Sequence, residues 1–227
     1  MSPSKGDGKR GQGRALILVE NAAIPYDRRV MAEANSLLAN GYAVSIICPT
    51  ASQQPARESL GGVLVRRYRS RPSRGGAASQ VAEYLVALVK TFALMVSLSR
   101  DPGFDVIHAC NPPDTFVVIG LVYRLLGKRF IFDQHDLCPE VYLSKFPDKA
   151  GALAHRLLLY FERLTYRAAH AVISMNESYR QVALERGTER GVVQDMLGHK
   201  TEAMTRRYAG SLRQHNAAKK MPNVSPI

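Results

Sequence analysis

Three polar loops hold the side chains of this sequence that are best suited to chemistry. They cover residues 20–29, 108–114 and 133–140, and each one follows a short apolar run of the kind that forms a buried strand. In a parallel sheet, ligands bind beyond the carboxyl ends of the strands, close to a reversal of strand order. The sequence therefore predicts that the three loops share one site, although polar residues also collect in loops simply because loops are solvated.

The two histidines in these loops are expected to play different parts. His135 follows a predicted strand and can face a ligand there, although a histidine in such a loop often only forms hydrogen bonds within it. His108 falls inside a predicted strand, so we expect a buried core histidine with its hydrogen bonds satisfied. Of the two, His135 is the candidate for a functional site.

The cysteines give no sign of a metal centre or a disulfide framework. They number three, in no Cys-x-x-Cys or comparable spacing: Cys48, Cys110 and Cys138. This odd number of thiols, and N-terminal residues 1–13 that lack the apolar core of a signal peptide, indicate a reducing cytoplasm. We therefore predict a cytoplasmic protein with no metal site, in which residues 1–13 form a disordered leader.

Short apolar runs alternate with amphipathic segments along residues 14–187. The apolar runs, which predict strands, lie at 15–19, 42–48, 63–68, 104–110, 128–133 and 169–175. The segments with helical spacing lie at 27–40, 80–99, 115–126, 149–167 and 176–186. We expect Gly41 to end the first helix in a left-handed conformation and Asp114 to cap the third. The alternation predicts an α/β fold with a single Rossmann-like, doubly wound parallel sheet.

An apolar run at 81–98 is long enough to raise the question of a membrane span. Glu83 and Lys90 interrupt it, so a helix that is buried, or that faces a membrane along one side, is favoured over one that crosses. The formal net charge of +12 suits an anionic membrane surface, a pyrophosphate-bearing acceptor or nucleic acid. Charge alone does not choose among these partners.

Three patterns in the polar loops follow one another along the chain. They are Asp27-Arg28-Arg29-Val30, then Asn111-Pro112-Pro113-Asp114, then Phe132-Asp133-Gln134-His135-Asp136. In combination they resemble the N-terminal domain of family-4-type glycosyltransferases, over residues 14–187. The resemblance implies half of a GT-B fold, in which two Rossmann-like domains face each other across a cleft. The first domain of that fold chiefly holds the acceptor, and the second holds the nucleotide-sugar.

The resemblance also implies roles for individual residues. His135 would contact the donor sugar, and Asp136 would fix the loop that carries it. The acceptor side would be lined by four residues: Asp27, Arg28, Asn111 and Asp114. Displacing a nucleoside diphosphate from an anomeric carbon needs a positioned acceptor hydroxyl and contacts to an oxocarbenium-like sugar. The implied substrates are a nucleotide-sugar and a glycan or lipid-linked acceptor, with no tightly bound cofactor.

Residues 188–227 carry a different signature. Leu197-Gly198-His199 is followed by Tyr208, nine residues after the histidine, in an order that resembles the end of a tyrosine recombinase, or phage integrase. In that family the histidine helps to stabilise the attacked phosphate, and the tyrosine forms a covalent link to DNA. The family also needs arginines and a His-x-x-Arg element upstream. No His-x-x-Arg occurs in this sequence, so DNA is not an expected partner.

We interpret the chain as a glycosyltransferase acceptor domain joined to a recombinase-like remnant, with peripheral contact to the inner face of a membrane. Ancestrally it would transfer a sugar to a polysaccharide or glycolipid acceptor. Because no donor-binding domain is recognisable, we expect a truncated protein that is inactive alone, and whether it is an enzyme stays open. One alternative is a DNA-strand transferase with Tyr208 as nucleophile. Another is a binding protein that captures an acceptor or pairs with a separate donor domain.

Overall fold

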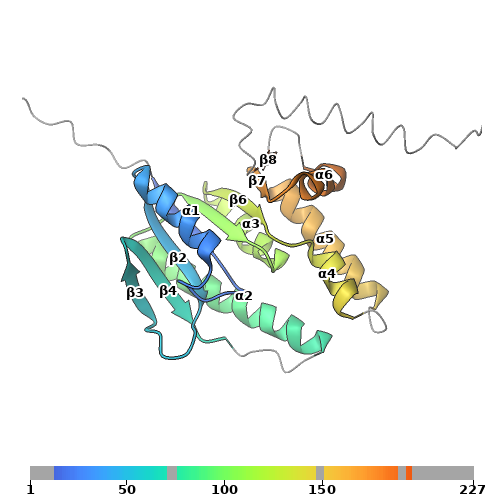
Figure 1. Ribbon diagram of the computed structural model, residues 1–227, viewed down its shortest axis with the longest axis horizontal. Helices are drawn as coiled ribbons and strands as arrows, with labels where there is room; N and C mark the ends of the chain where they lie inside the picture. Colours follow the sequence, from blue (N-terminus) through green and yellow to red (C-terminus); the bar gives the residue numbers. More distant parts are fainter. Residues whose placement is uncertain (1–12, 71–75, 147–150, 189–192, 196–227) are drawn as a thin grey trace, which may run out of the picture.

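The computed structural model describes residues 13–70, 76–146, 151–188 and 193–195, which form one mostly parallel sheet covered by helices (Figure 1). In these residues the sheet has eight strands, in the order β3-β4-β2-β1-β5-β6-β7-β8. Only the β3–β4 pair is antiparallel. The strand order reverses between β1 and β5, which is where open α/β sheets bind ligands. The predicted doubly wound sheet is confirmed.

Six of the strands fall where the sequence predicts them. The bounds are β1 (Arg14–Leu18), β2 (Ala43–Pro49), β3 (Arg57–Leu60), β4 (Val63–Tyr68), β5 (Val106–Cys110), β6 (Arg129–Gln134), β7 (Ala171–Ser174) and β8 (Val193–Asp195). The sequence analysis did not predict β3 or β8. β8 pairs in parallel with β7, so the sheet continues into the segment that was assigned to a recombinase-like remnant.

The helices also follow the predicted segments, with one addition. They are α1 (Arg28–Ala39), α2 (Ala77–Arg100), η1 (Asp114–Phe116), α3 (Val117–Leu125), α4 (Cys138–Lys145), α5 (Ala152–Ala168) and α6 (Glu177–Arg186). α4 replaces part of a predicted loop, and Pro139 lies in its first turn, where a missing backbone N–H costs nothing. Gly41 has the predicted left-handed conformation, with φ at 84°.

The prediction that Asp114 caps the third helix is wrong. A turn of 3-10 helix precedes α3, and no side chain caps either of these two helices with a hydrogen bond. The Asp114 carboxylate instead accepts a hydrogen bond from the side chain of Asn111. The reason is competition for the carboxylate, because a short polar side chain can bond to a neighbouring side chain as readily as to the helix backbone.

The helices divide the core between the two faces of the sheet. α1 packs on one face, where Val30 and Ala34 meet β1 residues such as Ile17. α2, α3, α5 and α6 pack on the other face, where they meet Leu16 and Leu18 of β1 (Figure 1). The side chains of a strand alternate between faces, and the chain winds first one way from β1 and then the other. Right-handed crossovers therefore place α1 opposite the later helices.

α2 is partly buried along its length. Its core side contributes Ala87, Met95 and Leu98, while most of its other apolar side chains are exposed. Among the described residues, Ser79–Arg100 is the one stretch with the length and mean hydropathy, 1.8, that a membrane span requires. Because α2 packs against β2 and β4, it is a helix of the folded domain with one apolar side turned outward. The prediction was a helix that is buried or that faces a membrane along one side, and contact of this outward side with a membrane stays a prediction.

Candidate functional site

Asn111 connects two of the three polar loops at the switch in strand order. Its side-chain oxygen accepts hydrogen bonds from the backbone amides of His135 at 2.6 Å and Asp136 at 3.0 Å. Its side-chain nitrogen donates to the backbone carbonyl of Asp136 at 2.7 Å and to the Asp114 carboxylate at 2.9 Å. Asn111 is 1% exposed, so both ends of a buried amide are satisfied. The structure thus brings the loops 108–114 and 133–140 together, as the sequence predicts.

Asp114 lies in the same network and is buried. Burial raises the pKa of its carboxyl to about 6, and the hydrogen bond from Asn111 opposes that rise. Its backbone carbonyl accepts a hydrogen bond from Thr165 of α5, so the residue also ties the loop to the helices behind it. The hydrogen bonds of Asn111 and Asp114 therefore hold the loops of the site in place from within the domain. Contact of these two residues with an acceptor stays a prediction.

A carboxylate holds the ring of His135. Asp133, at the end of β6, is fully buried, and its Oδ2 lies 2.5 Å from Nε2 of His135 and 3.3 Å from Nε2 of His108. Burial alone would raise the pKa of Asp133, but the two imidazoles outweigh it and hold that pKa below its ordinary range. The sequence analysis named His135 but not Asp133, the residue that orients it.

His135 itself is almost enclosed. Its side chain is 3% exposed, and its Nδ1 has no hydrogen-bond partner in the part of the chain that the structure describes. A buried ring nitrogen without a partner is costly, because nothing replaces the lost hydration. The contact of His135 with a donor sugar stays a prediction, and it needs the ring or its loop to move toward the surface.

The first polar loop places α1 against this region. The Asp27 carboxylate caps α1 by accepting hydrogen bonds from the amides of Arg29 at 3.0 Å and Val30 at 3.1 Å. Arg28 is exposed, and Asp136 is partly exposed, so these two predicted site residues can reach solvent. Roles for Asp27 and Arg28 in acceptor binding stay predictions, and so does the role of Asp136 in fixing the loop of His135.

Glu33 is a residue of this site that the sequence analysis did not find. It lies in α1, between the buried Val30 and Ala34, and its Oε2 is 3.4 Å from Nε2 of His108. Burial raises the pKa of Glu33, and so does the charge of Asp133. The sequence does give one indication of Glu33, because its carboxylate lies beside the apolar positions of an amphipathic helix. A buried carboxylate needs a polar or charged partner.

His108 is buried in β5, as predicted, but its Nε2 makes no hydrogen bond of good geometry among the described residues. It lies between the carboxylates of Glu33 and Asp133 instead. Burial would lower the pKa of His108, but these two carboxylates outweigh it and raise that pKa above its ordinary value. The expectation of satisfied hydrogen bonds is therefore not met at this atom.

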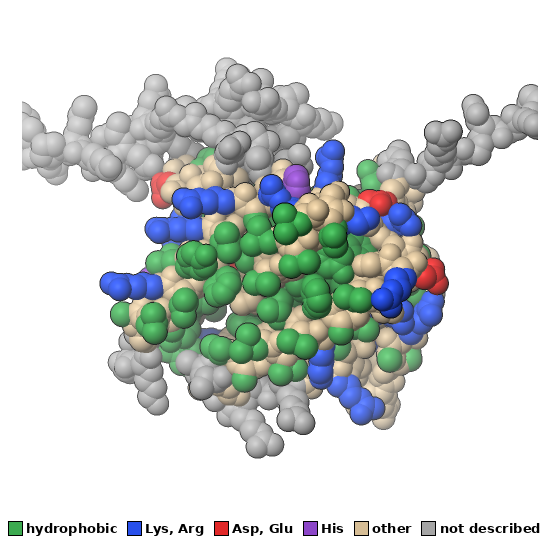
Figure 2. All heavy atoms as spheres, turned by 180° about the vertical axis from the view of Figure 1, so that it is seen from behind, with side chains coloured by type: hydrophobic (Ala, Val, Ile, Leu, Met, Phe, Trp, Pro, Cys, Tyr) green, Lys and Arg blue, Asp and Glu red, His purple; other side chains and the backbone are tan. Residues whose placement is uncertain are grey.

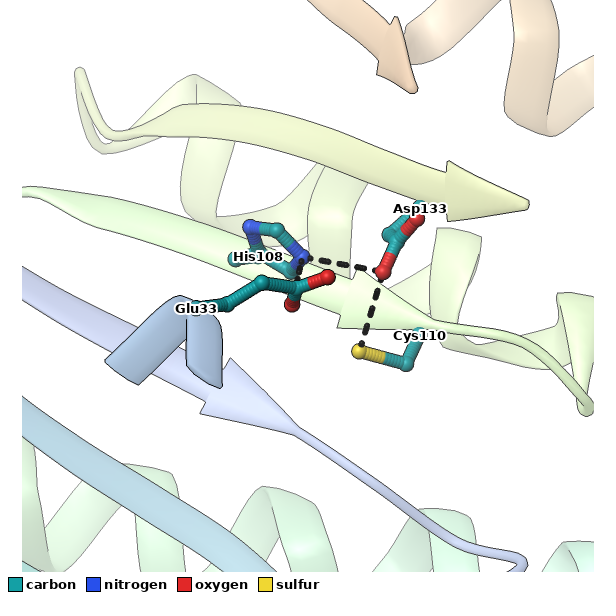
Figure 3. Close-up of side chains that lie close together, drawn as sticks. All are labelled: Glu33, His108, Cys110 and Asp133. Atoms are coloured by element: carbon teal, nitrogen blue, oxygen red, sulfur yellow. Dashed lines mark hydrogen bonds and ion pairs between the residues drawn. The ribbon is translucent and has the colours of Figure 1, made fainter. Parts of the chain in front are cut away.

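Four side chains of this region have donor atoms that could hold a metal ion. They are Glu33 of α1, His108 and Cys110 of β5, and Asp133 of β6, and their donor atoms all lie within 4.8 Å of one another (Figure 3). His108 pairs with Ile131 and Cys110 with Asp133 in the β5–β6 register, so these side chains leave the sheet on the α1 face.

The two residues predicted for a recombinase-like remnant, His199 and Tyr208, lie outside the described residues.

The sheet and its loops define the described residues as a Rossmann-like domain. A family model for the glycosyl transferase 4-like domain matches residues 26–194. The match covers most of the chain, which therefore belongs to this family. Both the match and the sheet run past residue 187, where the sequence analysis ended the domain.

Solved structures agree with this fold. Sucrose-phosphate synthase from Thermosynechococcus elongatus is similar with a TM-score of 0.58 at 16% identity, over 81% of this chain and 47% of that one. A second structure of the same protein gives 0.56 at 15% identity, over 88% of this chain and 98% of that one. The catalytic domain of starch synthase IV from Arabidopsis thaliana, bound to ADP and acarbose, gives 0.53 at 11% identity, over 81% and 51%.

At these identities the likeness lies in the fold alone. Apart from the second sucrose-phosphate synthase structure, the chain spans about half the length of these proteins. In the sequence comparison, no curated protein matches the chain.

Proposed function

We propose that this domain forms the acceptor side of a glycosyltransferase that moves a sugar from a nucleotide-sugar to a glycan or lipid-linked acceptor. The observation that carries the proposal is the Asn111 network, which fixes the loops after β5 and β6 together at the switch in strand order. Family membership supports the reaction class. The buried network supports a preorganised position for the reacting groups.

The reaction needs three things from the protein. An acceptor hydroxyl must be aimed at the anomeric carbon, where its oxygen forms a new bond while the bond to the diphosphate breaks. The hydroxyl proton leaves for a base or for solvent, and the departing diphosphate carries the negative charge. We assign acceptor positioning to the surface around Arg28 and Asp136, and the contact with the donor sugar to His135, held by Asp133.

A second lobe has to complete the site. The resemblance assigns the grip on the nucleotide to a donor-binding domain, and the described residues contain one sheet. We therefore expect the 227-residue chain by itself to bind an acceptor and to transfer no sugar. Transfer that depends on His135 in the purified chain alone would contradict this expectation.

The outer surface of the helices on the α2 face of the sheet, which α2, α3, α5 and α6 cover, favours an acceptor that is carried by a membrane. α2 exposes six large apolar side chains: Val81, Leu85, Val86, Val89, Phe92 and Val96. Figure 2 shows hydrophobic side chains over much of this face, with Lys and Arg side chains around its edge. Apolar contact surrounded by basic residues is the pattern that binds anionic bilayers from one side. We infer peripheral contact with the inner face of a membrane.

The cytoplasmic location is part of the same proposal. Cys48, Cys110 and Cys138 are all free, which supports a reducing compartment. A DNA-strand transferase would depend on His199 and Tyr208, which lie outside the described residues. A covalent DNA adduct that disappears in Tyr208→Phe would favour that function over sugar transfer.

The test is acceptor binding by the full chain. We would screen immobilised glycans and lipid-linked saccharides and expect at least one class to be retained, with retention reduced in Arg28→Ala. Arg57→Ala is the matched control, because Arg57 is also exposed but lies on β3 at the far edge of the sheet. Loss of retention to the same degree in both variants would indicate a general charge effect and contradict an acceptor site at α1. Retention of no saccharide would contradict the proposal itself.

A further inference from the structure

The four-donor cluster on the α1 face has the chemistry of a zinc site. Glu33 and Asp133 offer carboxylate oxygens, His108 offers an imidazole nitrogen, and Cys110 offers a thiol sulfur. Calcium and magnesium prefer all-oxygen sites, whereas a mixture of sulfur, nitrogen and oxygen suits zinc. The cluster differs from a surface group of acidic residues, because three of its four members are buried in the sheet.

Three of the six distances between donors are close to those around a tetrahedral ion, and all six are within 4.8 Å. Bonds of about 2.0 Å to nitrogen or oxygen and about 2.3 Å to sulfur, at the tetrahedral angle, separate neighbouring donors by roughly 3.3 to 3.6 Å. His108 Nε2 lies 3.4 Å from Glu33 Oε2 and 3.3 Å from Asp133 Oδ2. Cys110 Sγ lies 3.7 Å from Asp133 Oδ2. Figure 3 shows these three contacts as dashed lines, and the remaining donors would have to move closer together to surround an ion.

Two donor atoms point into the cluster without hydrogen-bond partners. Nε2 of His108 and Oε2 of Glu33 are buried and lie 3.4 Å apart as an ion pair, but neither makes a hydrogen bond of good geometry among the described residues. Such atoms normally find a hydrogen-bond partner, because burial without one loses the hydrogen bonds that water would make. A cation bound between them would satisfy both at once.

We propose that Glu33, His108, Cys110 and Asp133 bind one zinc ion. The ion would join α1 to β5 and β6, three elements that are far apart in the sequence. One oxygen, Asp133 Oδ2, contacts His108, Cys110 and His135, so an ion bound there would place His135 beside a metal ligand. The site is a structural one, because all four positions come from the protein.

The sequence alone predicts no metal site, because its cysteines have no Cys-x-x-Cys or comparable spacing. Here the ligands come from positions 33, 108, 110 and 133, and only the fold brings them together. The nearby Arg29 guanidinium, which contacts Met175, adds a positive charge that works against a cation. The ion would bind Cys110 as a thiolate. The negative charges of this thiolate and of the two carboxylates more than balance the positive charge of Arg29.

Metal uptake by the full chain tests the proposal without any sugar substrate. The chain is stripped with a chelator and titrated with Co²⁺, which reports tetrahedral geometry and thiolate ligation through its absorption. We expect one Co²⁺ per chain, a sulfur-to-cobalt charge-transfer band, and displacement by Zn²⁺. Cys110→Ser should abolish the band, and Glu33→Gln should weaken binding at least tenfold.

Cys48→Ser is the matched control, since Cys48 is an equally buried cysteine on β2 that is not in the cluster. It should keep both the band and the affinity. If Cys110→Ser fails to fold, the partly exposed Glu33 still gives a variant that tests the site. No uptake by the wild-type chain, or uptake that is unchanged in Cys110→Ser and Glu33→Gln, would show that the cluster is only a hydrogen-bonded network and overturn the proposal.

Discussion

The two faces of the sheet differ in how their buried polar side chains are grouped. The face under α2, α3 and α5 buries an apolar core that includes Phe116, Phe130 and Tyr166. The α1 face buries apolar residues near α1, but it also buries Asp133 and His108 beside the partly exposed Glu33. Buried charge occurs on both faces, because Glu162 of α5 is 1% exposed and pairs with Arg186 of α6. The α1 face differs in that its carboxylates, imidazole and thiol lie close enough together for one ligand to use them.

The largest expected effect is a loss of stability when core packing is removed on the face that α2, α3, α5 and α6 cover. Phe130 is 1% exposed and packs so closely on Gly120 of α3 that a Cβ there would lie 2.8 Å from its ring. Phe130→Ala should lower the free energy of unfolding by about 3–5 kcal/mol, measured by urea denaturation. Leu125→Ala, at a position that is 89% exposed, is the control and should change it by less than about 0.5 kcal/mol. Equal effects of the two substitutions would contradict the place of Phe130 in the packed core.

Asp114 should make stability depend on pH. Its folded pKa of about 6 lies above its ordinary value, so the folded state binds the proton more tightly than the unfolded state does. Its contribution is fully present below about pH 4 and is lost as the pH rises through 6. Asp114→Asn keeps an oxygen for Asn111 and should be roughly 2–3 kcal/mol more stable than wild type at pH 7, with little difference at pH 4. Unfolding curves at both pH values measure this, and a difference that is the same at both would rule out the titration.

Membrane contact should depend on the outward side of α2. Val89 is 68% exposed, and Val89→Glu adds a negative charge to that surface. We expect roughly tenfold weaker binding to anionic phospholipid vesicles, about 1.4 kcal/mol, in a sedimentation assay. Ala32→Glu, at an exposed position of α1 on the opposite face, makes the same charge change and should have a smaller effect. If wild type also fails to bind the vesicles, the apolar surface has another occupant.

The smallest expected effect is at the start of α1. Asp27→Ala removes the acceptor for the amides of Arg29 and Val30 and should destabilise the domain by about 1 kcal/mol. Thermal or urea unfolding measures it. Asp27→Ser, which keeps a capping oxygen, should restore most of the loss. Failure of serine to restore it would mean that Asp27 acts through its charge and not as a cap.

Most of the sheet could be predicted because its strands are short apolar runs with clear ends. β3 could not, because Arg57–Leu60 is a polar edge strand whose pairing depends on the turn at Gly61 and Gly62. Both glycines have positive φ, 57° and 95°, as a tight hairpin requires. β8 was missed because Val193–Asp195 is three residues long and lies in a segment whose signature suggested another origin.

The site was predicted at the level of loops better than at the level of contacts. The positions after β5 and β6 follow from the rule on carboxyl ends of strands, and Asn111 does meet His135 and Asp136 there. The approach of Glu33 to His108 could not be predicted, because it depends on how α1 lies across the sheet. The enclosure of His135 was also not visible in the sequence, since burial in a loop depends on its neighbours in space.

The amide of Asn111 has a consequence for how this domain can diversify. The side chain of Asn111 forms hydrogen bonds with both loops. A longer or shifted loop after β6 would therefore leave polar groups of the loop after β5 without hydrogen-bond partners. The two loops must therefore change together or not at all. If the proposed function holds, new acceptor preferences should arise first at positions that the amide does not reach, such as the exposed Arg28 on α1.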